Sequence, residues 1–331
     1  ARHLTVVNNF VVAANLDEGG TLIPNKVRWS GINDETAWTA SASTQSDSQL
    51  LQASSQYGGG WIMGLTGGKY GLVFQESSIW RMDYFGSPAV FSFDETFPGI
   101  GTPARNSIVQ IGEMVFFLGQ DGFYQITGGA SLIPIGANKV DQMFIDDVDA
   151  TNYHRIFGAA DPIHRKIMWI YPSKISGGTP DKAMVYDWIN KKWSTGEFNS
   201  EIIYNSLGSG QTLEDLDDIS TSLDALMASL DSREYQGGAM ALSAFDTSHQ
   251  KATFSGSALA ATLDTAEGEP FAPDSTDYGK SSYIKGVRPL IDGSGLTLTA
   301  QIGSRRKLDK AVVFSASASP HADTNICPFR N

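Results

Sequence analysis

The chain has 331 residues, of which 41% are hydrophobic and 18% charged, and it carries a formal net charge of −12. This composition is typical of a folded globular protein, and the negative charge disfavours wrapping around nucleic acid, which requires a basic face. The single cysteine, Cys327, excludes an internal disulfide framework. No apolar run reaches the ~18 residues that a membrane-spanning helix needs.

Glycine-punctuated aromatic segments predict an all-β protein. Residues 4–14 predict two strands joined at Asn8-Asn9, because asparagine tolerates the left-handed backbone conformation of a tight turn. A third strand is predicted at 25–30, and a polar loop or connection at 39–56. Because Ala1 already lies at the edge of a strand, we expect the first domain to be incomplete at its N-terminus.

The most informative stretch runs from Tyr70 to Thr127 and consists of two similar halves. Each half is an apolar strand, a tight turn and a second strand rich in aromatic residues. The dipeptide Asp121-Gly122 is a strong hairpin signal, because glycine reaches positive φ at little cost. Leu72 and Val115 hold equivalent places 43 residues apart. A repeat of this length predicts the blades of a β-propeller.

The same pattern predicts a second unit at 60–100, a third at 107–143 and a fourth at 155–193. A fifth unit starts at 201 and resumes at 234. The fifth unit contains an acidic insertion, residues 211–234, with seven carboxylates against one arginine and thus a net charge of −6. Its leucines recur at three- and four-residue steps, which leaves a helix and an ordered loop equally open. Insertions on a propeller face usually contact a partner. The candidate contact residues here are Asp215, Asp217 and Asp218.

From residue 256 the pattern changes to four alternating strands with long connections. They are predicted at 258–264, 283–292, 296–302 and 311–316. This arrangement predicts a small antiparallel β-sandwich over residues 256–331, after a β-propeller over residues 1–255. Residues 324–331 show no closing strand, so we expect an open sheet edge and an incomplete C-terminal domain.

A dense basic cluster occupies residues 303–310, on a predicted hairpin of the C-terminal domain. Its candidate contact residues are Arg305, Arg306, Lys307 and Lys310. They could meet an acidic partner surface or DNA phosphates, and a solvated turn is the alternative.

No set of residues predicts catalysis. None of the five histidines has a second histidine at metal-ligand spacing. The carboxylate pairs Asp94-Glu95, Asp146-Asp147 and Asp217-Asp218 could hydrolyse a glycoside only if two acids faced each other across a cleft. Adjacent acids on a strand point to opposite faces. The sequence therefore predicts no enzyme, no catalytic residues, no cofactor and no metal.

Several segments together resemble the β-propeller tail hub, or nozzle, of short-tailed bacteriophages. These segments are 28–38, 71–86, 99–108, 115–124 and 242–246. The order of the parts also resembles that family: propeller units, the strand that carries Val185-Tyr186-Asp187, and then a β-rich terminal domain.

The resemblance implies a structural component of the virion, assembled in the host cytoplasm. Such proteins form a homo-oligomeric ring, usually sixfold, below the portal and adaptor and beside tail fibre or needle proteins. DNA would pass through the lumen without sequence-specific binding, and an acidic wall would repel it. The family has no catalytic residues, and compared with it the chain is short by at least one blade.

Two other functions stay open at this stage. One is a propeller hydrolase or lyase that acts on surface polysaccharide. The other is a module that binds glycans of the host surface, with Trp61, Trp80 and Trp169 as a sugar platform. Packing of these tryptophans in the core is the simpler interpretation, because they lie within predicted strands.

Overall fold

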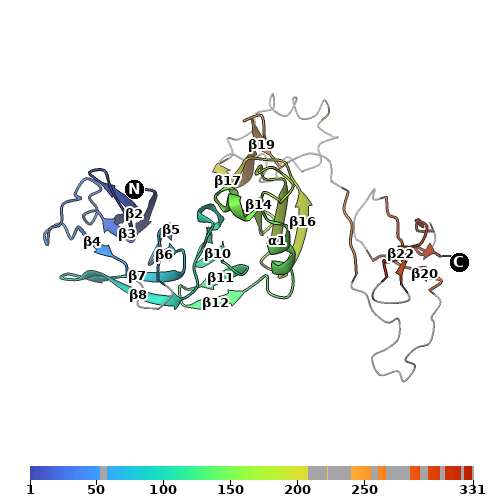
Figure 1. The fold of residues 1–331 in the computed structure, drawn as a ribbon, viewed down its shortest axis with the longest axis horizontal. Helices are drawn as coiled ribbons and strands as arrows, with labels where there is room; N and C mark the ends of the chain where they lie inside the picture. Colours follow the sequence, from blue (N-terminus) through green and yellow to red (C-terminus); the bar gives the residue numbers. More distant parts are fainter. Residues whose placement is uncertain are drawn as a thin grey trace, which may run out of the picture. The chain divides into compact units, whose positions relative to one another are not determined.

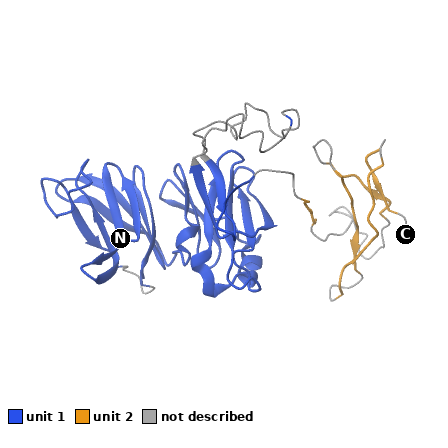
Figure 2. Cartoon of the chain, turned by 90° about the horizontal axis from the view of Figure 1, so that it is seen from above, with its two compact units in different colours: residues 1–257 blue, residues 258–331 orange. Residues whose placement is uncertain are grey.

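The computed structural model describes residues 1–52, 58–207, 222, 240–254, 260–265, 284–290, 297–305, 310–321 and 324–329. The chain divides into two compact units, Ala1–Ser257 and Ala258–Asn331 (Figure 2). The boundary predicted between residues 255 and 256 lies beside this division. Within the described residues, no helix is both long and apolar enough to cross a membrane.

The first unit is built of antiparallel β-sheets that follow one another along the chain (Figure 1). The first sheet contains β1 (His3–Val7), β2 (Phe10–Glu18), β3 (Thr21–Trp29) and β4 (Asp47–Leu50). The second contains β5 (Ile62–Thr66), β6 (Gly71–Gln75), β7 (Ser78–Gly86) and β8 (Val90–Pro98). The third contains β9 (Val109–Ile111), β10 (Met114–Leu118), β11 (Phe123–Thr127) and β12 (Ser131–Pro134). The fourth contains β13 (Phe157–Asp161), β14 (Lys166–Tyr171), β15 (Lys182–Asp187) and β16 (Lys192–Glu197), and the fifth contains β17 (Ile202–Leu207), β18 (Met240–Phe245) and β19 (Lys251–Thr253).

This arrangement confirms the all-β prediction, and the two halves of the stretch 70–127 take equivalent places in successive sheets. In every one of these sheets, strands that are neighbours in the chain are also neighbours in the sheet. Leu72 and Val115 lie on β6 and β10, each the second strand of its sheet. The turn at Asn8-Asn9 joins β1 to β2, and Asn8 has a positive φ of 50°. Gly122, with a φ of 152°, lies in the turn between β10 and β11.

The sequence reasoning missed three short helical segments between the strands. They are the 3-10 helices η1 (Arg105–Ser107) and η2 (Ala150–Arg155) and the α-helix α1 (Asp141–Asp147). Helix α1 has no side-chain cap, and a helix of this length is unstable alone. Its Phe144 is fully buried against Phe123 and Tyr171, at ring-centroid distances of 5.0 and 4.9 Å. Tertiary packing therefore supports this helix.

Buried apolar clusters join each sheet of the first unit to the next one. Trp29 of the first sheet meets Phe91 of the second at 5.3 Å between ring centroids. The second and third sheets meet at Phe74 and Phe117, whose rings lie 5.2 Å apart. The third and fourth sheets share the largest aromatic cluster, and the fourth and fifth share one of mostly aliphatic residues. Burial of apolar surface at these junctions is the main favourable term in the folding of the unit.

The second unit contains only very short strands within its described residues. β20 (Gly286–Val287) pairs with β23 (Cys327–Pro328), and β21 (Gly303–Ser304) pairs with β22 (Val313–Phe314). The prediction of a strand at 258–264 is wrong over residues 260–264, which form no strand and expose Leu263 by 88%. The expectation that residues 324–331 contain no strand is also wrong, because β23, which carries the buried Cys327, pairs with β20. A segment with alternating apolar residues is stable as a strand only where other strands or a second layer cover its apolar face.

Candidate interaction surfaces

The predicted contact residues fall partly outside the described residues. Asp215, Asp217, Asp218, Arg306 and Lys307 belong to this undescribed part. Arg305 directly follows β21 and Lys310 lies shortly before β22, and these two strands pair with each other.

Among the carboxylates considered for catalysis, Asp217 and Asp218 lie outside the described residues, and the described ones belong to separate elements. Asp94 lies on β8 of the second sheet and Asp147 at the end of α1. The Asp147 carboxylate accepts hydrogen bonds from Lys182 Nζ at 2.9 Å and from the Tyr171 hydroxyl at 3.0 Å. Burial, followed by this hydrogen bond, raises the pKa of Tyr171. Over the described part of the chain, no three His, Cys, Asp or Glu side chains form a group that could hold a metal ion.

The three tryptophans considered as a sugar platform are also separate. Trp80 and Trp169 belong to different buried clusters. The Trp80 indole N–H donates to Gln75 Oε1 at 2.8 Å, and the Trp169 indole N–H donates to the Ser107 carbonyl at 2.8 Å. Only Trp61 is exposed, by 43%. These residues therefore do not form one exposed aromatic surface.

A first candidate surface is one face of the first sheet. The strand register places Leu4 opposite Ala13, Ala13 opposite Arg28 and Arg28 opposite Ser48, and residues opposite each other share a face. Residues two positions apart on a strand also share a face, so each strand contributes two residues. We call this face the outer face, and its members are Leu4, Val6, Val11, Ala13, Lys26, Arg28, Ser48 and Leu50. The opposite face carries Val12 and Trp29 into the core shared with the second sheet. On the outer face Leu4, Val6 and Leu50 are 68%, 55% and 48% exposed.

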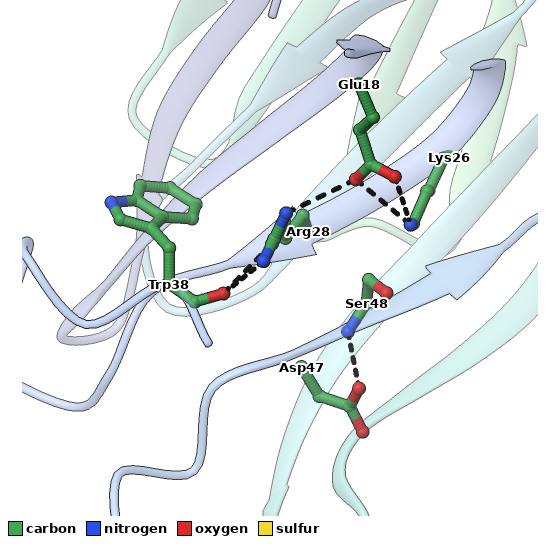
Figure 3. A network of polar contacts seen from close by, with 6 residues as sticks. All are labelled: Glu18, Lys26, Arg28, Trp38, Asp47 and Ser48. Carbon is green, nitrogen blue, oxygen red and sulfur yellow. Dashed lines mark hydrogen bonds and ion pairs between the residues drawn. The ribbon is translucent and has the colours of Figure 1, made fainter. Parts of the chain in front are cut away.

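A charged network lies beside these apolar residues (Figure 3). The Glu18 carboxylate accepts hydrogen bonds from Lys26 Nζ at 2.9 and 3.0 Å, and from Arg28 at 3.3 Å. The hydrogen bond from Lys26 is the main cause that lowers the pKa of Glu18. Arg28 also donates to the Trp38 carbonyl, at 3.1 Å from Nε, and so ties the loop before β4 to the sheet. Leu4, Glu18, Arg28 and Trp38 line a shallow cavity of about 240 Å³.

A second candidate surface lies where the first three sheets meet. We call it the basic cleft, a cavity of about 300 Å³ lined by Arg2, His3, Leu4, Gly64, Leu65, Thr66, Arg105, Ile108 and Gln110. These residues come from the start of β1, from β5, and from the segment that contains η1 and β9. The Gln110 side chain closes one side, because it donates to the Gly67 carbonyl at 2.7 Å and accepts from the Gly67 N–H at 3.3 Å.

The electrostatics of the basic cleft differ from those of the acidic chain as a whole. Among the described residues, no carboxylate forms an ion pair with Arg2 or Arg105. The Arg2 guanidinium lies 5.7 Å from the centre of the Trp61 ring, a cation–π contact. Burial and then the Arg105 charge lower the pKa of His3. The two guanidinium groups supply the positive charge of the cleft.

Sequence reasoning did not find the basic cleft. Its charged residues, Arg2 and Arg105, are far apart in the chain and belong to no basic run. Only the packing of β1 against β5, and of β5 against η1, brings them to one place. A scan of the sequence against protein-family models found no match. A search of curated proteins found no significantly similar sequence.

Proposed function

We propose that the chain is a structural component of a bacteriophage tail: the hub or nozzle ring below the portal and adaptor, through which DNA passes. The ring is a homo-oligomer, sixfold as in the family that the sequence resembles, and is part of the virion after assembly in the host cytoplasm. Tail fibre or needle proteins are its further partners. DNA crosses the lumen without sequence-specific binding, and the second unit serves as a small sandwich-like domain.

The observation that carries this proposal is the packing of the first strands of successive sheets. β1 packs against β5, β9 against β13, and β13 against β17. Each of these strands lies at the edge of its own meander. Antiparallel meanders whose first strands converge are typical of propeller blades arranged around an axis. This arrangement supports the propeller interpretation, and the propeller is the fold of the tail hubs that the sequence resembles.

The outer face of the first sheet supports assembly from several copies. It exposes Leu4 and Val6 on β1 and Leu50 on β4, with Lys26 and Arg28 of β3 between these two edge strands. Exposed apolar residues interspersed with charged ones can form a protein interaction site. A second copy of the chain is the partner that the ring requires.

The location of the chain in purified phage particles tests the proposal directly. Antibodies raised against the purified chain are bound to particles and viewed by electron microscopy with gold labels. We expect labels on the tail axis, below the capsid vertex. Labels only on peripheral spikes, or free chain without particles, would overturn the assignment.

The mass of the purified chain tests the assembly. We expect light scattering to give a multiple of the monomer mass, and the double variant Val6→Lys/Leu50→Lys to give the monomer. The matched control is Phe85→Lys, which introduces a lysine at an 82% exposed position of the second sheet and should leave the mass unchanged. A monomeric wild type, or an unchanged mass in the double variant, would argue against assembly through the outer face.

An enzymatic function would show itself in a different assay. The chain is incubated with capsular or surface polysaccharide, and released oligosaccharide is measured for the wild type and for Asp94→Ala and Asp147→Ala. We expect no release from any of the three. Release by the wild type that either variant abolishes would favour the glycan hydrolase or lyase.

A further inference from the structure

We propose that the basic cleft is a binding site for an acidic peptide segment, whose carboxylates pair with Arg2 and Arg105. This inference goes beyond the tail-hub function and does not depend on it. It rests on the charge, the lining and the strand geometry of the cleft.

Two arginines in a partly enclosed site favour an anion. Among the described residues neither guanidinium has a carboxylate partner. Arginine is suited to carboxylates because its planar fork of N–H groups makes two parallel hydrogen bonds. The Arg2 guanidinium stacks over the Trp61 ring, and Arg105 begins the short helix η1. Both arginines are exposed to an incoming ligand.

The rest of the lining favours a peptide over nucleic acid. Leu4, Leu65 and Ile108 add a small apolar part to a lining that is mostly polar. A volume of about 300 Å³ accommodates a few side chains, whereas a DNA duplex presents its phosphates on a rod with a groove about 12 Å wide. β1 is an edge strand of the first sheet, and at its end the Val6 carbonyl already accepts from the Gly68 N–H. Edge strands present backbone N–H and C=O groups to which an extended peptide can bind.

The occupant that we propose is this chain's own acidic insertion, residues 211–234, which carries a net charge of −6. This charge complements the two arginines of the cleft. An acidic segment of a different protein is the alternative that the following experiment distinguishes.

The receptor is the full chain with Asp215→Asn, Asp217→Asn and Asp218→Asn, so that its own insertion competes less for the cleft. Fluorescence anisotropy measures the binding of three labelled peptides: residues 211–234, the same peptide with all its carboxylates as amides, and a glutamate oligomer. We expect the acidic peptides to bind and the amide peptide not to bind. Affinity should fall as salt rises from about 50 to 300 mM, because exposed charges are screened.

Arg105→Gln in this receptor should weaken the acidic peptides about tenfold, the equivalent of roughly 1.4 kcal/mol. The matched control is Lys192→Gln, which removes the same charge on the fourth sheet and should change nothing. Circular dichroism verifies that both variants fold. The proposal would be overturned if both variants bound the acidic peptides equally well, or if no acidic peptide bound. It would also be overturned if duplex DNA competed more strongly than peptide.

The two acidic peptides identify the source. Binding of peptide 211–234 to the receptor, with weaker binding to the unsubstituted chain, assigns the cleft to this chain's own insertion. Binding of the glutamate oligomer alone would overturn the assignment to residues 211–234. Leu4 belongs to both the outer face and the cleft, but Val6 and Leu50 do not line the cleft, so the double variant Val6→Lys/Leu50→Lys should lose assembly and keep peptide binding.

Discussion

The junction between the third and fourth sheets and the outer face of the first sheet are built from the same kind of antiparallel meander. At the junction, Phe123 lies within 5.0 Å of the ring centres of Trp169 and Trp193, and Trp169 is fully buried. On the outer face, Leu4 and Val6 project from β1 and are 68% and 55% exposed.

The difference comes from neighbours and not from the strands themselves. A sheet face contributes to stability when a second layer removes its apolar side chains from water. The same kind of face, left uncovered, contributes little to stability and is open to a partner. Substitutions at the junction should therefore change the free energy of unfolding, whereas substitutions on the outer face should change the assembly of copies.

The largest effect is expected for Trp169→Ala at the junction. The substitution removes a buried ring and its hydrogen bond to the Ser107 carbonyl. We expect it to lower the free energy of unfolding by about 3–5 kcal/mol, measured by urea denaturation followed by circular dichroism. Phe85→Ala, at an 82% exposed position, is the control and should change stability by less than about 0.5 kcal/mol. Similar losses in both variants would remove the distinction between covered and open regions.

A smaller loss is expected for Ser107→Ala, next to the same tryptophan. The buried Ser107 hydroxyl accepts from the Leu118 N–H at 3.1 Å and donates to the Ala104 carbonyl at 2.7 Å. Its removal leaves a buried backbone donor without this partner, which costs about 1–3 kcal/mol. The same change on the outer face, Ser48→Ala, should cost less than about 0.5 kcal/mol. A loss for Ser48→Ala as large as that for Ser107→Ala would remove the distinction between the junction and the outer face.

The smallest effect is expected for Glu18→Gln, in the charged network of the outer face. Pairs of this exposure contribute about 0.2–1 kcal/mol, and Glu18 meets both Lys26 and Arg28. Because the pKa of Glu18 is lowered in the folded state, its contribution is present above the unfolded pKa of about 4.3. It is lost as the pH falls through the folded pKa.

The difference in unfolding free energy between wild type and Glu18→Gln should therefore be measured at pH 7 and again near pH 3. We expect it to shrink toward zero at the lower pH, and also in about 1 M salt at pH 7. A difference that stays constant with pH would assign the effect of the substitution to packing and not to charge.

The strands of the first unit were largely predictable, because their signals are local. Asn8-Asn9 and Asp121-Gly122 form turns for reasons of backbone conformation, and the flanking apolar residues form strands beside them. The helix α1 was not predictable in this way, since it is stabilised by Phe144 in a cluster made by residues distant in the chain. The strand expected at 258–264 was predicted wrongly for the same reason. Its alternating pattern is local, and the pattern does not tell whether another layer of the protein covers the apolar side chains.

The sequence by itself determined the all-β class, the 43-residue repeat and the order of the sheets, because turn chemistry and the alternation of side chains act over a few residues. Only the tertiary structure decided which faces are covered, which tryptophans are buried, and that Arg2 and Arg105 share a cleft. These features depend on how separate sheets pack against one another. The free energy of that packing comes from contacts between residues that are far apart in the chain.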